Sequence, residues 1–325
     1  MRALASPASL KGVLSADDAA AALASGMRSV AGLEVDEAPV ADGGGGTAEV
    51  LRRSLGGTWR TAVVGDAFGR PVEARFLVLP DGTAVVESAE AVGITRLGED
   101  ELDPLRASSA GVGELLLAAL AARPSALLVC VGGTATVDGG AGLRSAVGGA
   151  LRGAAPIRVA CDVRNPLLGE RGAARVFGPQ KGATPAAVRE LERRLAADAE
   201  LVPYRDLRGA GAGGGLGAGL AALGAELVPG AELVLDAIGF DDRARDAALV
   251  VTGEGTVDAT TLEGKAPGAV LERCRALGVG CELFGGLVRD GIPAHALSGR
   301  PERAADDLAE LGKRLGLGLA GVDLA

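Results

Sequence analysis

The sequence predicts an α/β fold made of two α/β domains. The first observation is a repeated unit in which an extended segment leads through a glycine-rich loop into a helix, at 35–54, 127–150 and 247–277. The second is a change at 61–92 to alternating, β-branched segments separated by turn residues, which is typical of antiparallel strands. The third is length, since 325 residues are enough for two domains of ordinary size. We place a domain junction near residue 60.

The remaining elements follow from hydrophobic periodicity and from the residues that begin and end helices. Ser15 is a helix cap, with Asp17 and Asp18 in the first turn where they complement the helix dipole. Thr184-Pro185 begins another helix, because proline suits the first helical position. Strands are expected at 1–5, 59–64, 72–79, 83–86, 157–163, 233–237 and 281–284, and further helices at 15–28, 108–122, 218–223 and from 301 onward.

Composition excludes several classes of protein. The net charge is −9 and there is no run of basic residues, which argues against a nucleic-acid partner. No apolar run approaches the roughly 20 residues needed to cross a membrane, and residues 1–10 lack the apolar core of a signal peptide. The four cysteines are scattered without a Cys-x-x-Cys pair, which favours reduced thiols. We expect a soluble cytoplasmic protein.

Familiar catalytic motifs are missing. His295 is the single histidine, so a His-rich metal site is excluded and a Ser-His-Asp triad is not expected. Gly264-Lys265 is followed by alanine and lacks the upstream glycine of a P-loop. No Gly-x-Gly-x-x-Gly follows the first strand, so the nicotinamide-binding fingerprint is absent as well.

Lysine usage gives a positive signal. Only four of the 33 basic residues are lysines, and three of these, Lys11, Lys181 and Lys265, lie beside a glycine. Arginine and lysine are not interchangeable, and a flexible point charge beside glycine suits phosphate or carboxylate binding better than surface solvation. The only asparagine and the only glutamine, Asn165 and Gln180, lie close in sequence to Lys181. We predict a polar site that includes these residues.

Carboxylates stand at the ends of three predicted strands, at Asp138, Asp162 and Asp258. Together with the glycine-rich loops and the lysines they supply what phosphoryl transfer needs: backbone amides for phosphates, carboxylates for Mg²⁺ and for the attacking hydroxyl, and fixed positive charge. For Asp42 and Asp138 an ordinary turn is an equally good explanation, because Asp-Gly is itself a turn signal. We interpret the glycine-rich loops as separate walls of one cleft.

Several segments resemble the signature blocks of the bacterial glycerate kinase type-1 family. The blocks occur in the family's order over essentially the whole chain, at Ser9–Ala16, the Asp42 loop, Gly132–Gly142, Cys161–Gly169, Phe177–Ala183 and Thr252–Lys265. The resemblance implies phosphorylation of D-glycerate by ATP with Mg²⁺, in a cleft between two domains. One of these would be Rossmann-like and discontinuous, at 1–60 plus 230–325, with 61–229 as an inserted α/β domain.

The resemblance and the residue patterns together give a set of predicted roles. The predicted catalytic residues are Lys11, Asp162 and Asp258. The predicted substrate-binding residues are Asn165, Gln180, Lys181, Thr261 and Lys265. Phosphates of the nucleotide are assigned to Gly43, Gly44, Thr47, Gly133, Thr134, Thr136, Gly253 and Gly255. The metal is assigned to Asp42, Asp138 and Glu254.

The chain departs from the family's usual residues at some loop positions. Charged or hydrogen-bonding side chains are usual where this sequence has Ala8, Gly45, Val137, Thr256 and Thr260. Two alternatives therefore stand beside a D-glycerate kinase. One is a weakened or inactive relative that binds an acidic or phosphorylated metabolite, and the other is a kinase for a related hydroxy acid. A homodimer is left open.

Overall fold

Two α/β units make up the computed structural model, which describes residues 1–289 and 291–321. Unit 1 comprises Met1–Asp42, Glu49–Ser54 and Ala231–Ala325, of which 290 and 322–325 lie outside the described residues. Unit 2 comprises Gly43–Ala48 and Leu55–Gly230. The sequence-based division has the same order along the chain, but it assigned segments 43–48 and 55–60 to the first domain.

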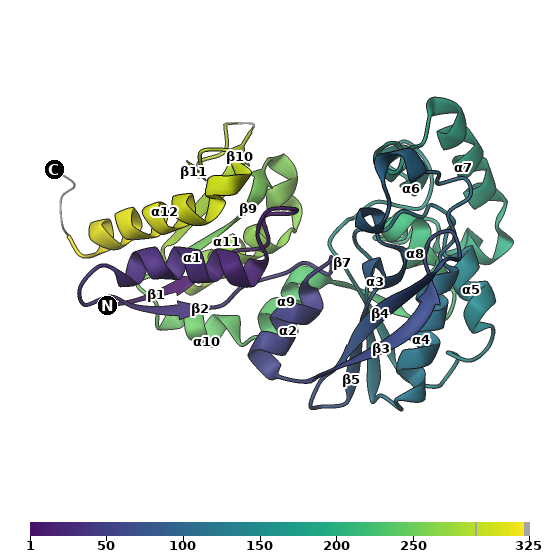
Figure 1. Ribbon diagram of the computed structural model, residues 1–325, viewed down its shortest axis with the longest axis horizontal. Helices are drawn as coiled ribbons and strands as arrows, with labels where there is room; N and C mark the ends of the chain where they lie inside the picture. Colours follow the sequence, from purple (N-terminus) through teal and green to yellow (C-terminus); the bar gives the residue numbers. More distant parts are fainter. Residues whose placement is uncertain (290, 322–325) are drawn as a thin grey trace. The chain divides into compact units, whose positions relative to one another are not determined.

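Unit 1 is built on a parallel sheet with the strand order β11-β10-β9-β1-β2 (Figure 1). From β1 the chain proceeds to β2 on one side, whereas β9, β10 and β11 extend the sheet on the other side. The direction of winding therefore reverses between β1 and β9. The strands are β1 (Arg2–Ala5), β2 (Glu34–Glu37), β9 (Leu249–Val257), β10 (Cys281–Val288) and β11 (His295–Ala296).

Helices cover both faces of this sheet because its central strands are apolar on both sides. Along β1, Ala3 and Ala5 belong to one apolar cluster with α1 and α12, whereas Leu4 belongs to a second cluster with α9, α10 and α11. Two-faced burial of this kind is what a parallel sheet requires. The helices are α1 (Ala16–Arg28), α9 (Gly230–Ala237), α10 (Phe240–Arg245), α11 (Ala266–Leu277), α12 (Ala304–Leu319) and α2 (Thr47–Leu55), of which residues 49–54 belong to unit 1 and the remaining residues belong to unit 2.

Helices α1 and α12 lie side by side, as Figure 1 shows, and glycine makes their close approach possible. A Cβ atom on Gly26 would lie 1.9 Å from the carbonyl oxygen of Ala309, and one on Gly312 would lie 2.2 Å from that of Leu23. Any side chain at either position would force the helices apart.

The prediction of a strand at 233–237 is wrong, since these residues complete helix α9. A short apolar run has no periodicity that separates a strand from a buried helix. Val234 and Leu235 are buried against the apolar cluster on the α9 face of the sheet.

Unit 2 contains one mixed sheet in the order β3-β4-β5-β6-β7-β8. The predicted antiparallel strands form its first half, and β5 then pairs in parallel with β6. The strands are β3 (Thr58–Gly65), β4 (Pro71–Val78), β5 (Thr83–Glu87), β6 (Ala126–Cys130), β7 (Ile157–Cys161) and β8 (Glu226–Pro229). The helices are α3 (Ala89–Val92), α4 (Ala110–Ala121), α5 (Ala141–Val147), α6 (Ala173–Phe177), α7 (Pro185–Ala197) and α8 (Ala212–Ala221).

Candidate active site

The carboxyl ends of β1 and β9 mark the place in unit 1 where a ligand is expected. In open α/β sheets ligands bind where the winding direction reverses, beyond the carboxyl ends of the strands. The loop after β1 carries Lys11, and the carboxyl-terminal half of β9 carries Glu254. The two segments contact each other, because Ala8 N donates to the carbonyl oxygen of Gly253 at 2.8 Å.

Strand β9 is longer than the sequence suggested. The predicted strand ended near Val251 and gave way to a glycine-rich loop, but β9 continues to Val257 and pairs with β10 along this stretch. Gly253 lies opposite Phe284, and a Cβ atom on Gly253 would lie 2.2 Å from the Phe284 carbonyl oxygen. The glycine is therefore required by the spacing of the two strands. The assignment of Gly253 and Gly255 to nucleotide phosphates stays a prediction that this geometry does not favour.

Glu254 is the centre of a charged cluster in unit 1. Its Oε1 accepts a hydrogen bond from the Thr261 hydroxyl at 2.7 Å and lies 3.6 Å from the Lys265 amine. The same amine lies 3.8 Å from Asp258 Oδ1. Lys265 is thus shared by two carboxylates, and four of the residues predicted from sequence lie together.

A short 3₁₀ helix, η5 (Ala259–Glu263), holds this cluster in place. Asp258 accepts hydrogen bonds from the amide and the hydroxyl of Thr260, and its own amide donates to the Thr261 hydroxyl at 3.1 Å. This reciprocal capping fixes Asp258 at the start of η5. Gly264 then takes a left-handed conformation, with φ of 119°, and turns the chain into Lys265.

The pKa values of the two carboxylates in the cluster are shifted in opposite directions. Burial raises the pKa of Glu254 above its usual value; the Thr261 hydrogen bond and the nearby lysines, Lys265 and Lys11, oppose that shift, whereas Asp42 adds to it. Hydrogen bonds from Thr260 outweigh burial and, with Lys265, hold the pKa of Asp258 below its usual value. Asp258 is therefore ionised throughout the neutral range.

A pocket of about 330 Å³ opens beside this cluster. Lys11, Glu254 and Lys265 line it, which brings together residues from the β1 loop, from β9 and from the start of α11. Its wall also includes Arg300 and Asp307, which the sequence analysis did not single out. Arg300 follows Gly299 but is an arginine, the chain's usual basic residue, and Asp307 lies within α12, so no sequence pattern marked them.

Lys181 lies inside unit 2. Its amine donates to Thr134 Oγ1 at 3.1 Å and to the Thr136 carbonyl oxygen at 2.7 Å, and the residue is only 3% exposed. Burial lowers the pKa of Lys181 to about 7, against a small opposing effect of Asp138. The geometry favours a structural role in fixing the loop after β6, and Thr134 and Thr136 are buried with it. The substrate- and phosphate-binding roles of these three residues stay predictions.

Asp138 holds the starts of helices α4 and α5 together through both of its oxygens. Oδ2 accepts hydrogen bonds from the amide and hydroxyl of Ser109, both at 2.8 Å, and from the Gly142 amide at 3.1 Å. Oδ1 accepts one from the Gly140 amide at 3.1 Å. Four internal donors leave the carboxylate little capacity for a cation, so the geometry favours the turn interpretation over a metal-binding role.

The glycine-rich loop at 43–47 presents its amides to a carboxylate of the protein. Glu87, at the end of β5, accepts hydrogen bonds from Gly46 N at 3.2 Å and Ala48 N at 2.7 Å. These amides lie at the N-terminus of helix α2, where the helix dipole favours an anion. Within the loop, Thr47 donates its hydroxyl to the Gly44 carbonyl oxygen at 2.8 Å. Glu87 gave no sequence signal, since it lies about 40 residues from the amides that it binds.

The other predicted residues of unit 2 follow strand β7. Asp162 is half-buried directly after the strand, and Asn165 donates its side-chain amide to the Arg171 carbonyl oxygen at 2.7 Å. Gln180 is exposed in the short 3₁₀ helix η3 (Pro179–Lys181). Asn165 therefore has a turn-forming partner, whereas Gln180 is accessible to a ligand.

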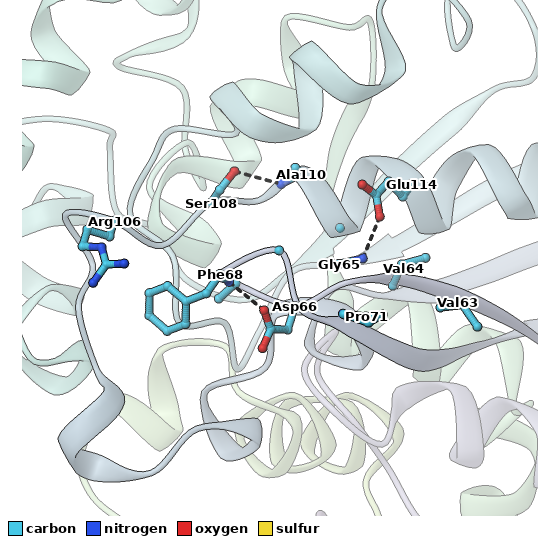
Figure 2. Close-up of a pocket in the computed structure, with 13 residues that line it drawn as sticks. Val63, Val64, Gly65, Asp66, Phe68, Pro71, Arg106, Ser108, Ala110 and Glu114 are labelled. Atoms are coloured by element: carbon cyan, nitrogen blue, oxygen red, sulfur yellow. Dashed lines mark hydrogen bonds between the residues drawn. The ribbon is translucent and has the colours of Figure 1, made fainter.

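A hollow of about 510 Å³ in unit 2 contains none of the predicted site residues (Figure 2). Its carboxylates and its hydroxyl are engaged in local structure. Asp66 accepts from the Phe68 amide at 2.8 Å, Glu114 from the Gly65 amide at 2.7 Å, and Ser108 from the Ala110 amide at 3.2 Å. We assign no chemistry to this hollow.

Two further observations concern the cysteines and the possibility of a membrane-spanning helix. All four cysteines are free thiols. In the described part of the chain, no helix is both long enough and apolar enough to cross a membrane.

Comparison with known proteins shows the family. The sequence profile of the glycerate kinase family matches residues 3–156 and 150–301. A relative from Escherichia coli K12, named glycerate 2-kinase, is 39% identical over 305 residues, which cover 82% of this chain and 80% of the relative. Glycerate kinase from Bacillus subtilis 168 is 39% identical over 317 residues, covering 86% and 83%. A solved structure from Salmonella typhimurium LT2, assigned as a glycerate kinase 2, superposes with a TM-score of 0.81 at 33% identity and covers 99% of this chain and 98% of its own.

The two-unit α/β fold and these comparisons define a phosphotransferase of the kinase class. The similarity extends over nearly the whole chain and includes both units. The chain belongs to the glycerate kinase family.

Proposed function

We propose that the protein transfers the terminal phosphoryl group of ATP to a hydroxyl of D-glycerate in a reaction that requires Mg²⁺. The observation that carries the proposal is the cluster of Glu254, Asp258, Thr261 and Lys265 beside the Lys11 loop. It supplies carboxylates and fixed positive charge at one place, which is the requirement of phosphoryl transfer. Family membership supports the choice of glycerate.

Asp258 is the residue that would orient the attacking hydroxyl. Its lowered pKa keeps it ionised at neutral pH, so it accepts a hydrogen bond from the hydroxyl and takes the proton as the new bond to phosphorus forms. Lys265, held between Asp258 and Glu254, would stabilise the negative charge of the transferring group. Thr261 keeps Glu254 in position.

Asp42 and Glu254 are the carboxylates that would hold Mg²⁺. The negative charge of Asp42 adds to the raised pKa of Glu254, and a divalent cation would relieve that repulsion. The described residues include no group of three or more His, Cys, Asp or Glu side chains arranged to bind a metal. Mg²⁺ commonly takes only one or two carboxylates, with phosphates and water completing its shell, so the donor set fits. The chemistry that Mg²⁺ would supply if held by these two carboxylates is neutralisation of the charge of the ATP phosphates.

The test is a coupled assay of ADP release with D-glycerate and ATP, in Mg²⁺ and with a chelator. We expect turnover that is lost with the chelator, and that falls about 10²-fold or more in Asp258→Asn. The name of the Escherichia coli relative motivates the 2-hydroxyl as acceptor, and phosphorus NMR of the product distinguishes the 2- and 3-phosphates. Folded wild-type protein without turnover above background would refute the proposal.

A second candidate is a relative that binds an acidic metabolite without catalysis. It is favoured by the occupation of the Gly46 and Ala48 amides by Glu87, and by the small residues at Ala8, Gly45 and Thr256. Thermal stabilisation by glycerate or ATP without ADP formation would support it, and ordinary kinase turnover would exclude it. A panel of hydroxy acids tests the third candidate, a kinase for a related substrate.

A further inference from the structure

Arg300 occupies a defined place at the pocket of unit 1. It lies between β11 and a short 3₁₀ helix, η6 (Pro301–Arg303), and lines the same 330 Å³ pocket as Lys11 and Lys265. Its side chain comes from the C-terminal part of the chain, whereas Lys11 comes from the N-terminal part. The fold alone brings the two together.

The backbone that carries Arg300 is anchored by a buried carboxylate. Asp307, on α12, accepts hydrogen bonds from the amide of Ser298, at 3.0 Å, and from its hydroxyl. The Arg300 amide in turn donates to the Ser298 hydroxyl oxygen at 3.3 Å. Asp307 also receives the guanidinium of Arg303 at 3.3 Å. The position of Arg300 is therefore fixed by its main chain, and its guanidinium is not used to fix it.

Positive charge is in excess around this pocket. Of the two carboxylates in its wall, Glu254 is engaged with Thr261 and Lys265, and Asp307 with Ser298 and Arg303. Within residues 1–289 and 291–321, neither Lys11 nor Arg300 forms an ion pair. Two cations that form no ion pair thus face one pocket, although Lys11 is near enough to lower the pKa of Glu254, and an anionic ligand is what would pair with them.

We propose that Arg300 binds the carboxylate of the hydroxy acid substrate and thereby sets its specificity, with Lys11 as a second cation. The planar guanidinium matches a carboxylate with two parallel hydrogen bonds, which a lysine cannot reproduce. Lys265, already shared by two carboxylates, is left for the transferring group. The identity of the acid rests on the proposed function, but the pairing with a carboxylate does not.

Binding and turnover are measured with D-glycerate and with D-glyceramide, its uncharged analogue, in wild type, Arg300→Gln and Arg300→Lys. Arg314→Gln is the matched control, since Arg314 is exposed on α12 and outside the pocket. We expect Arg300→Gln to weaken the binding of D-glycerate. Its calorimetric Kd and its KM should both rise about 10- to 100-fold. The glyceramide values and the KM for ATP stay within about twofold, Arg300→Lys is intermediate, and the control behaves as wild type.

Several outcomes would overturn the inference. If Arg300→Gln behaves like Arg314→Gln while wild type turns over, the proposed function stands and the role of Arg300 is wrong. An increase confined to the KM for ATP would assign the guanidinium to phosphates instead. If wild type binds D-glycerate without turnover and Arg300→Gln abolishes binding, the kinase proposal fails and the inference holds. If wild type binds no hydroxy acid, both fail.

Discussion

Identical residue types perform different tasks in this protein because their burial differs. Lys181 and Lys265 both lie beside a glycine, and the sequence gives them the same prediction. The amine of Lys181 is inside unit 2 and donates to two threonine oxygens, whereas the side chain of Lys265 is 31% exposed beside two carboxylates. Only the second is placed to meet a ligand.

Removing the charge of Lys265 tests its coupling to Glu254. Because Lys265 lowers the pKa of Glu254, Lys265→Met should raise that pKa further. The proposed Mg²⁺ site requires ionised Glu254, so on that proposal the acid limb of log kcat/KM for MgATP should move to higher pH, in addition to an overall loss of activity. Lys11→Met should give a smaller shift in the same direction.

The control for this experiment is Lys313→Met, which removes an exposed lysine on α12. Its acid limb should coincide with that of wild type. An acid limb that stays in place in Lys265→Met would show that Glu254 does not govern the acid side of the profile.

At the scale of elements, β9 shows how a glycine can be required for packing where a loop was expected. Gly253→Ala would drive a methyl group into the Phe284 carbonyl oxygen, whereas the same change at Gly255 meets atoms no nearer than 3.5 Å. We expect Gly253→Ala to lower the free energy of unfolding by about 1–3 kcal/mol, and Gly255→Ala by less than about 1 kcal/mol. Urea unfolding measures both. If the two variants were equally stable and both bound ATP more weakly than wild type to the same extent, the phosphate-binding interpretation of these glycines would be restored.

The start of α2 is a second case, since Glu87 accepts hydrogen bonds from the Gly46 and Ala48 amides of the loop that the sequence assigned to phosphates. Glu87→Ala leaves these amides without their acceptor, and we expect a loss of about 1–3 kcal/mol of unfolding free energy. Glu99→Ala, an exposed glutamate with no side-chain hydrogen bond among the described residues, should change it by less than about 0.5 kcal/mol. A neutral Glu87→Ala would mean that water or a ligand replaces the carboxylate.

At the scale of the whole molecule, buried Lys181 makes stability depend on pH. Its pKa is lowered to about 7 in the folded protein, whereas the unfolded chain has a pKa near 10.4. Between these values the unfolded chain binds more protons, so this lysine makes stability rise with pH from about 7 to 10. Below pH 7 Lys181 is charged in the folded protein as well, and the full cost of burying that charge lowers the free energy of unfolding.

The measurement is Tm as a function of pH for wild type and Lys181→Met. We expect the wild-type curve to rise relative to that of the variant across this window, so that the difference between them changes with pH. Parallel curves would show that Lys181 keeps its charge in the folded state. The methionine preserves the apolar stem, which limits the effect of packing.

The α/β class and most of the elements could be predicted, because strand, loop and helix patterns are local. Ser15 and Thr184 cap helices as expected. The predicted cluster around Glu254 and Lys265 is also local, since its members lie within 12 residues of one another. Arg300 and Glu87 were not predicted, because Glu87 accepts hydrogen bonds from amides about 40 residues away and Arg300 shares its pocket with Lys11 from the opposite end of the chain.

The sequence by itself determined the fold class, the family resemblance and the chemical inventory of carboxylates, lysines and glycines. The tertiary structure decided which of these groups are accessible. It extended β9 through a predicted loop, buried Lys181, saturated Asp138 with four donors and brought Arg300 to the pocket of Lys11. The reason is that accessibility and pairing depend on distances across the sheet and between its loops. A linear pattern of residue types does not contain those distances.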